Sequence, residues 1–538
     1  MKRRGFLAAA GAGSLLRLAA LPLPSAIALQ HERANANERA RAADFNPAEL
    51  DIAALQQQLG RGLTSAALVT AYLSRIARID HGGAGAAASS PKFRSVIAVN
   101  PLALDAARAL DAERRSGSVR GPLHGIPILI KDNIATQDPL PTTAGSLALA
   151  KSLHRDDAPL VAKLRAAGAI ILGKTNLSEW ANFRSTLSIS GWSAIGGQTG
   201  NAYDPARTPS GSSSGSATAA ALSLCAAAIG TETDGSILSP SAVNGLVGFK
   251  PSVGAVSGVG IVPLSPRQDV AGPMARSVAD AALIASVLYE RPRRKESIST
   301  SMASRQDKLR IGIAPPSDSM RGDVAALYRR AIDVWRHTGA EIIDAPLPRS
   351  LRQAQSAEFT ALLYEFKASL DAYLGALNAQ QTSVHSLAAL IEFNRRNADR
   401  ELVRFGQEIL EMAVTKGPLT DKAYLDALAE LRKLVEFEGL DPMFRDLRVD
   451  VLVAPGAGPA ALIDTILGDR NDTGGSTLGS AAAIAGLPSI TLPIGVLKGQ
   501  PVGMTVVAPR YAEDSLLRIA TKFEREGNLR VPPKFARS

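Results

Sequence analysis

The sequence contains few of the residues on which redox proteins and metal enzymes depend. Among its 538 residues there is one cysteine, Cys225, so an internal disulfide is excluded. This cysteine lies in an apolar, alanine-rich run, where we expect a buried and unreactive thiol. The six histidines are scattered, and none stands in a His-Glu-x-x-His pattern, so we expect no metal site.

Aromatic residues are also scarce, at 4% of the chain. No run of Lys and Arg is interleaved with them, which argues against a nucleic-acid groove and against nucleic acid as a partner. The glycine-rich stretches are not followed by the start of a helix, as a phosphate-binding loop would be. We therefore expect no nucleotide and no other cofactor. The formal charge of +10 indicates a basic surface, although four of these charges lie close to the N-terminus.

Residues 1–28 resemble a secretory leader. The sequence Arg-Arg-Gly-Phe-Leu at 3–7 is typical of a twin-arginine export signal, and small residues at Ala26 and Ala28 form a cleavage site. The apolar run between them contains Gly, Ser and Arg, so it would span a bilayer poorly. We expect export of the folded protein to the periplasm or beyond, with removal of the leader and no stable membrane insertion afterwards. Residues 29–46 read as a flexible segment.

Residues 47–538 show alternating strand and helix patterns and predict one large α/β/α domain around a central mixed β-sheet. The expected strands are Ser95–Val99, Ile126–Ile130, Ala169–Gly173, Arg310–Ala314, Val449–Ala454, Ser489–Pro493 and Val502–Val507. The expected helices between them include Leu102–Arg115, Asp157–Ala167 and Ser214–Ile229.

Two segments interrupt this alternation. Residues 291–307 are charged and rich in serine, which is typical of a surface linker. Residues 353–437 read as mainly helical and contain no catalytic motif. We expect this block to be a helical insertion that forms a wall of the active-site mouth.

Three short motifs carry the residues for nucleophilic chemistry. Ser236 ends the run Gly-Thr-Glu-Thr-Asp-Gly-Ser, Ser212 lies within a Ser/Gly run at 210–216, and Lys131 directly follows the apolar stretch 126–130. Cleavage of an amide requires an activated oxygen nucleophile, donors for the oxyanion and an acid for the leaving amine. A lysine can serve as the base only when it is neutral, and burial lowers its pKa.

In their order and spacing the three motifs resemble the amidase signature family over roughly Leu50 to Phe523. The family's triad consists of a serine nucleophile, a serine that follows a cis peptide bond, and a lysine. The resemblance implies that Ser236 is acylated, that Ser212 relays the proton after a cis bond at Gly211–Ser212, and that Lys131 is the base. The backbone N–H groups of Thr233, Asp234 and Gly235 would then form the oxyanion hole.

The sequence departs from the family's pattern at two places. The usual Gly-Gly-Ser-Ser-Gly-Gly reads Ser-Gly-Ser-Ser-Ser-Gly at 210–215, and the residue before Gly235 is Asp234 instead of glycine. Only the backbone N–H of Asp234 is needed, so its carboxylate must point away from the developing negative charge.

A second motif favours a different enzyme. Residues 211–215 also fit Gly-x-Ser-x-Gly, the nucleophile elbow of α/β-hydrolases, with Ser213 as nucleophile. That elbow must follow a buried strand, whereas residues 201–209 are turn formers. The last histidine in the chain, His385, lies inside the helical block. A catalytically inactive binding protein on the same fold is a further alternative.

Several stretches resemble the bacterial peptide amidases of this family, namely residues 173–184, 188–193, 230–236 and 363–367. This resemblance implies hydrolysis of the C-terminal carboxamide of a peptide, with release of ammonia. The tentative substrate-binding residues are Asn182, Phe183 and Ser213, and Arg184, Tyr364 and Phe366 would help to form the walls. Packing alone could also explain the aromatic residues, Trp180 above all. An amidase of small aliphatic or aryl amides is the alternative, and the leader disfavours a relative that works on tRNA.

Overall fold

The computed structural model describes residues 45–82, 92–290, 308–317, 320–471 and 476–537. The leader at 1–28, nearly all of the segment at 29–46 and the linker at 291–307 therefore lie outside the described residues.

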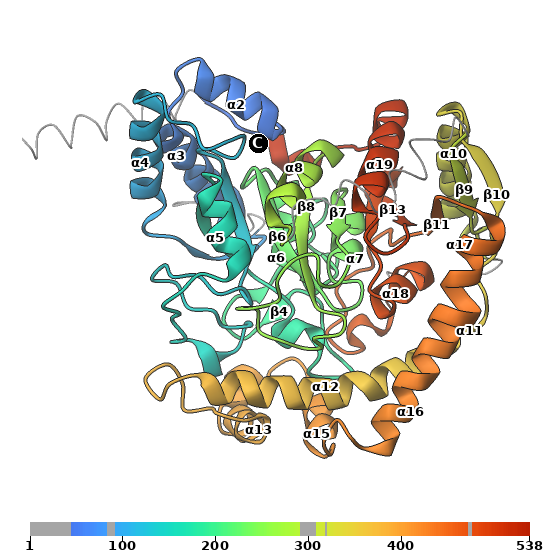
Figure 1. Ribbon diagram of the computed structural model, residues 1–538. Coiled ribbons are helices and arrows are strands. Elements are labelled where there is room, and N and C mark those ends of the chain that lie inside the picture. The colour runs from blue at the N-terminus through green and yellow to red at the C-terminus, as the bar shows by residue number, and fades with distance from the viewer. Residues whose placement is uncertain (1–44, 83–91, 291–307, 318–319, 472–475, 538) are drawn as a thin grey trace, which may run out of the picture.

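A large mixed β-sheet runs through the molecule and confirms the predicted α/β class (Figure 1). The described residues form an 11-stranded sheet in which β2 is parallel to both β3 and β6, whereas β8 is antiparallel to β6 and β7. In spatial order the strands are β1 (Val96–Val99), β3 (Ile170–Thr175), β2 (Pro127–Lys131), β6 (Ala227–Glu232), β8 (Val270–Ala275), β7 (Val247–Lys250), β12 (Ser489–Leu497), β13 (Gln500–Val507), β11 (Val451–Pro455), β9 (Arg310–Ile313) and β10 (Glu341–Asp344).

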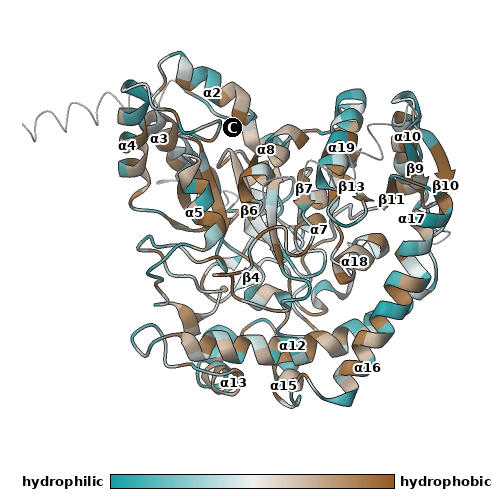
Figure 2. Ribbon diagram, viewed as in Figure 1, coloured by the Kyte–Doolittle hydropathy of each residue, from teal (hydrophilic) through white to brown (hydrophobic). Residues whose placement is uncertain are grey.

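Helices cover the sheet. Those that pack directly on it include α4 (Ala103–Arg115), α5 (Pro159–Ala166), α6 (Ser214–Ala221), α7 (Leu238–Val243), α8 (Val278–Leu288), α10 (Gly322–His337), α18 (Thr477–Ile484) and α19 (Glu513–Gly527). At the N-terminal end, α2 (Ile52–Gly60) precedes α3 (Ser65–Arg75), which packs on α4. The central strands β2, β3, β6 and β8 are buried along their whole length, as expected for strands covered on both faces. Figure 2 shows teal residues mainly on outer helices such as α4 and α19.

Between β10 and β11 the described residues form helices and no strand. This helical layer consists of α11 (Ser350–Gln353), α12 (Gln355–Ala376), α13 (Leu387–Arg396), α14 (Ala398–Glu401), α15 (Glu408–Val414), α16 (Lys422–Leu431), a π-helical segment (Arg432–Leu440) and α17 (Asp441–Leu447). In Figure 1 the long helix α12 runs below the sheet and the loops at its lower edge. Residues 353–437 are thus mainly helical, as their periodicity predicts.

One predicted helix is wrong in its second half. The helix expected at Ser214–Ile229 ends at Ala221, and Ala227–Glu232 form the central strand β6. Ser223 has a positive φ of 53°, which breaks the helix. Alanine favours helices in isolation, but here the small side chains fill a strand position buried on both faces, so tertiary packing overrides the propensity.

Candidate active site

The topology of the sheet brings the three sequence motifs to one place. Strands β2 and β6 are parallel neighbours, so both end at the same edge of the sheet. Lys131 is the last residue of β2, and Ser236 lies in the turn between β6 and α7. Ser212 precedes α6, whose helix packs on both of these strands.

At this edge the side chains of Lys131, Ser212 and Ser236 form a continuous chain. Lys131 Nζ lies 2.8 Å from Ser212 Oγ, and Ser212 Oγ lies 3.0 Å from Ser236 Oγ. The peptide bond Gly211–Ser212 is cis, which confirms the prediction made for it. Lys131 and Ser212 are fully buried, while Ser236 is 8% exposed. Of the three, Ser236 is therefore the one that a substrate can reach.

The environment of Lys131 favours its neutral form. Burial lowers the pKa of the ammonium group to about 7, and the more distant carboxylates of Asp269 and Glu232 only partly oppose this shift. Lys131 Nζ also lies 2.9 Å from the hydroxyl of Thr231, which in turn accepts a hydrogen bond from Asn133. The sequence motifs did not point to Thr231, because a threonine at the end of a strand is common.

The turn from Thr233 to Ser236 has backbone donors available. Gly235 adopts a positive φ of 74°, a conformation that glycine adopts without strain. Among the described residues, no protein acceptor takes the N–H group of Asp234, Gly235 or Ser236. The turn therefore offers the donors that the family resemblance implies for an oxyanion.

Glu232 holds the far side of this turn. Its Oε2 accepts hydrogen bonds from the backbone N–H groups of Ile237, at 2.7 Å, and Leu238, at 2.9 Å. A carboxylate that accepts backbone donors at the start of α7 fixes the direction in which the chain leaves the turn. Glu232 is a residue that motif analysis missed, because only the folded chain brings its carboxylate back onto the helix.

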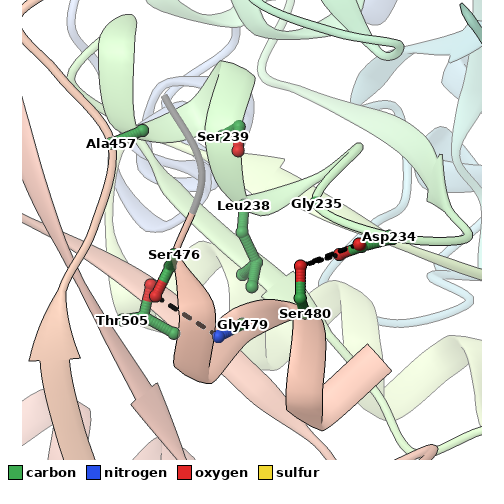
Figure 3. Close-up of a pocket in the computed structure, with 9 residues that line it drawn as sticks. All are labelled: Asp234, Gly235, Leu238, Ser239, Ala457, Ser476, Gly479, Ser480 and Thr505. Atoms are coloured by element: carbon green, nitrogen blue, oxygen red, sulfur yellow. Dashed lines mark hydrogen bonds between the residues drawn. The ribbon is translucent and has the colours of Figure 1, made fainter. Parts of the chain in front are cut away.

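The carboxylate of Asp234 bonds to α18, as Figure 3 shows. Ser480 Oγ donates to it, at 2.9 Å from one carboxylate oxygen and 2.7 Å from the other. The pKa of Asp234 is raised to about 6, mainly by burial and also by the nearby charge of Glu232, while the hydrogen bond from Ser480 opposes the shift. This contact gives the carboxylate a partner of its own, as required if Asp234 is to offer its backbone N–H to an oxyanion.

A cavity of about 120 Å³ adjoins the turn on the side of α18. Hydroxyl groups dominate its polar lining (Figure 3). It is lined by Asp234, Gly235, Leu238, Ser239, Ala457, Ser476, Gly479, Ser480 and Thr505. The residues contributed by α18 and β13 come from the C-terminal part of the chain, and the motif search named none of them.

The contacts of the tentative substrate-binding residues are mostly internal. Ser213 is fully buried, and its hydroxyl donates to the carbonyl of Thr231 and accepts from the N–H of the same residue. These bonds engage its one donor and one of its acceptor sites inside the protein, so we assign Ser213 a structural role in place of the expected substrate contact. Phe183 is 8% exposed and packs against Phe359 and Phe366 of α12, so it can contribute to a wall. Asn182 donates to Asp469 at 3.3 Å.

Arg184 does not reach a pocket surface, contrary to the expectation that it helps to form a wall. Its side chain is fully buried, forms ion pairs with Glu179 and Glu401, and lies over the rings of Trp192 and Phe405. Because Glu401 and Phe405 belong to the helical layer, Arg184 fastens this layer to the sheet domain. Trp180 is 2% exposed, in keeping with the packing role considered for it.

The rival elbow motif has the wrong surroundings. Residues 201–209, which precede it, form no strand, and its central Ser213 is closed off by backbone contacts. His385 lies in the helical layer, where its ring nitrogen is 3.3 Å from the carbonyl oxygen of Leu374. No histidine therefore completes an esterase triad with Ser213 in the described part of the chain.

The described residues contain neither a metal-binding cluster nor a membrane-spanning helix. No cluster of three or more His, Cys, Asp or Glu side chains there has the arrangement of a metal site. Within the same residues, none of the helices combines the length and the hydropathy needed to cross a bilayer.

Comparison with known proteins places this geometry in context. The family model described as amidase matches residues 68–517. The solved structure of native peptide amidase from Stenotrophomonas maltophilia is 44% identical, with a TM-score of 0.81, and the match covers 90% of this chain and 99% of that one. A probable amidase of Arabidopsis thaliana is 37% identical, covering 88% of this chain and 89% of the relative. One chain of the glutamyl-tRNA(Gln) amidotransferase of Salinispora arenicola is 32% identical, covering 90% and 98%.

Proposed function

The chain belongs to the amidase family, and from this premise we propose that Ser236, Ser212 and Lys131 are its catalytic residues. The protein is thus a hydrolase that acts on amides. The observation that carries the assignment is the unbroken chain of contacts from Lys131 Nζ through Ser212 Oγ to Ser236 Oγ, with only the last of these groups exposed.

In this proposal, neutral Lys131 accepts a proton from Ser212, which takes the proton of Ser236 as its oxygen attacks the amide carbon. The backbone N–H groups of the turn from Thr233 to Ser236 stabilise the negative oxygen of the tetrahedral intermediate. The proton then returns along the same path to the leaving nitrogen, and ammonia departs from a primary amide. Water enters, the relay removes its proton, and the acyl-enzyme on Ser236 is hydrolysed to the free acid.

For the substrate we propose the C-terminal carboxamide of a peptide. The similarity to a protein described as a peptide amidase, at 44% identity over nearly its whole length, supports this class. The helical layer also supports it, because the half-buried Phe359 of α12 packs on Phe183 and leaves apolar surface on that side of the molecule. Contacts with the peptide beyond the reacting amide could then be used to orient it.

A direct test compares a dipeptide amide, the matching amino-acid amide and the same peptide extended by one residue at its C-terminus. We expect ammonia release with the highest kcat/KM from the dipeptide amide, and no cleavage of the internal bond in the extended peptide. A faster reaction with small aliphatic or aryl amides would replace the substrate class and leave the amidase chemistry in place.

The catalytic assignment is tested with a fluorophosphonate that labels active serines. We expect the label on Ser236, no label and almost no turnover in Ser236→Ala, and slight residual turnover in Ser212→Ala. A label on Ser213 would favour the elbow motif. A wild-type protein that takes no label and releases no ammonia from any amide would instead be a binding protein on this fold.

A further inference from the structure

We propose that Gln268 is a positioning residue, which aims the backbone N–H of Asp234 at the oxyanion through a hydrogen bond to the carbonyl of Thr233. This inference rests on the proposed function, in which the turn before Ser236 stabilises the oxyanion. Gln268 lies just before β8, is fully buried, and belongs to none of the motifs that identify the active site.

The side-chain amide of Gln268 has a fixed orientation. Its Nε2 donates to the carbonyl oxygen of Thr233 at 3.2 Å and to Glu358 Oε1 at 2.8 Å, which uses both of its hydrogens. On the opposite end, the guanidinium of Arg267 donates to the amide oxygen. A flipped amide would direct its oxygen at the carbonyl oxygen of Thr233 and its NH₂ group at the guanidinium of Arg267, so this arrangement has one favourable orientation.

The hydrogen bond to Thr233 determines where the next N–H points. The carbonyl of Thr233 and the N–H of Asp234 belong to one planar trans peptide, in which the two groups point in opposite directions. When Gln268 holds the carbonyl on one side, the N–H of Asp234 must face the other side. Among the described residues that N–H has no protein acceptor, so it remains available for a ligand.

A second contact prevents Thr233 from rotating. Its hydroxyl donates to Asp269 Oδ1 at 2.6 Å, while Asp269 Oδ2 accepts the N–H groups of Leu264 and Ser265. Gln268 thus holds the carbonyl of Thr233, and Asp269, which follows Gln268 in the chain, holds its side chain. Gln268 and Asp269 both lie in the segment before β8, so this segment fixes the conformation of the turn.

The helical layer fixes the position of this segment before β8. Glu358, which accepts from Gln268, and Glu365, whose Oε1 pairs with Arg267 Nε at 3.0 Å, lie two turns apart on α12. Glu358 and Glu365 are both buried. One helix of the layer therefore fixes both ends of the Gln268 amide, which links the layer to the oxyanion turn.

The test replaces Gln268 by methionine, which has a similar volume and no donor. Loss of one oxyanion donor costs about 10²–10³ in kcat, and a misaligned donor should cost part of this, so we expect kcat to fall about 10- to 100-fold. KM should stay within about threefold, because the acyl-side contacts are unchanged. The substrate is whichever amide the wild-type enzyme cleaves.

Two inhibitors separate positioning from general damage. A peptide aldehyde reacts when Ser236 Oγ adds to its carbonyl carbon, its proton passing to the Lys131 relay, and the resulting oxyanion occupies the hole. The matching peptide alcohol has no carbonyl and binds by its other contacts alone. In Gln268→Met the affinity for the aldehyde should fall by the same factor as kcat, and the affinity for the alcohol should equal that of the wild type.

A variant of the same helix serves as the control. Asp371 of α12 accepts the N–H of Leu387 and touches none of these groups, so Asp371→Ala should loosen the helical layer and leave kcat unchanged. If Gln268→Met does not fold, Glu358→Met is measured in the same way, since it removes the partner that orients the amide. A loss of affinity for the aldehyde, without a loss of affinity for the alcohol, supports the proposal.

Three results for Gln268→Met would overturn the proposal. They are an equal loss of affinity for aldehyde and alcohol, an effect that appears as a raised KM, and a kcat within threefold of the wild type. If Ser236→Ala is inactive and Gln268→Met is normal, this inference alone fails. If Ser236→Ala stays active, the proposed function itself fails.

Discussion

Lys131 is buried without an ion pair among the described residues, and this isolation is the central electrostatic feature of the site. Taking an ammonium group out of water disfavours its charged form, whereas a carboxylate in direct contact would restore it. The neighbours of Nζ are hydroxyl oxygens and a carbonyl, so hydrogen bonding is satisfied without a compensating charge. The surroundings are thus suited to a lysine that acts as a base near neutral pH.

From this we expect activity to fall on the acid side of neutrality. The pKa of Lys131 is lowered to about 7, so the base is mostly neutral above this pH and becomes protonated as the pH falls through it. The value of kcat/KM, measured from about pH 5 to pH 9, should decrease about tenfold per pH unit below the midpoint.

Two substitutions separate the charge of Lys131 from its basicity. Arginine keeps the charge and cannot lose its proton, so Lys131→Arg should be as inactive as Lys131→Met. A substantial rate in Lys131→Arg would mean that the lysine acts only by its charge, and a flat acid limb would mean that another group is the base.

At the scale of single residues, the sequence predicted what short motifs encode. Ser236, Ser212 and Lys131 lie together as expected, because each motif ends at the same edge of the sheet. The substrate contacts were harder to predict. Ser213 stands beside Ser212 in sequence, yet its hydroxyl faces the backbone of Thr231, a contact that depends on how α6 meets β6.

At the scale of elements, the helical layer is joined to the sheet domain by a buried charge cluster. Glu401 accepts from the hydroxyl of Ser146 and the N–H of Leu147, and pairs with Arg184 at 3.6 Å. Removing one partner of a buried pair leaves a charge without compensation. The cluster therefore ties the position of the layer to the loops of the sheet domain.

We expect Arg184→Met to lower the free energy of unfolding by about 3–5 kcal/mol, since it leaves the carboxyl groups of Glu179 and Glu401 buried without their cation. Glu401→Gln should cost less, about 1–2 kcal/mol, because the amide oxygen can still accept from Ser146 and Leu147. Urea unfolding of both variants measures the difference. Equal and small effects would show that the cluster contributes little to the attachment of the layer.

Strand and helix periodicity predicted most strands of the sheet and the helical block, but missed β6, β7 and β8 at the centre and β10 at one edge. Strands β7 and β8 contain Gly, Pro and Lys, and β6 is alanine-rich, so none of them shows the alternation or the β-branched run that marks a strand. Their conformation is set by pairing with neighbours that lie far away in sequence. Such long-range pairing is invisible to a local pattern.

At the scale of the whole molecule, the sheet is complete only when nearly all of the chain is present. Strand β7 pairs with β12, and β11 pairs with both β9 and β13, so early and late segments are neighbours in space. A sheet of this kind is assembled from contacts between segments that lie far apart in sequence, which makes folding slow. The absence of disulfides removes any need for folding in an oxidising compartment.

We therefore propose that the protein is exported in its folded state by the twin-arginine signal at its N-terminus. Replacing Arg3 and Arg4 by lysine should leave folded, active amidase in the cytoplasm and deplete it from the periplasm. Arg17→Lys, a substitution of the same kind within the leader and outside the arginine pair, should be exported normally. Cell fractionation with an ammonia-release assay on each fraction measures the outcome. An unchanged periplasmic yield in the Arg3/Arg4 variant would assign export to another route and remove the twin-arginine interpretation.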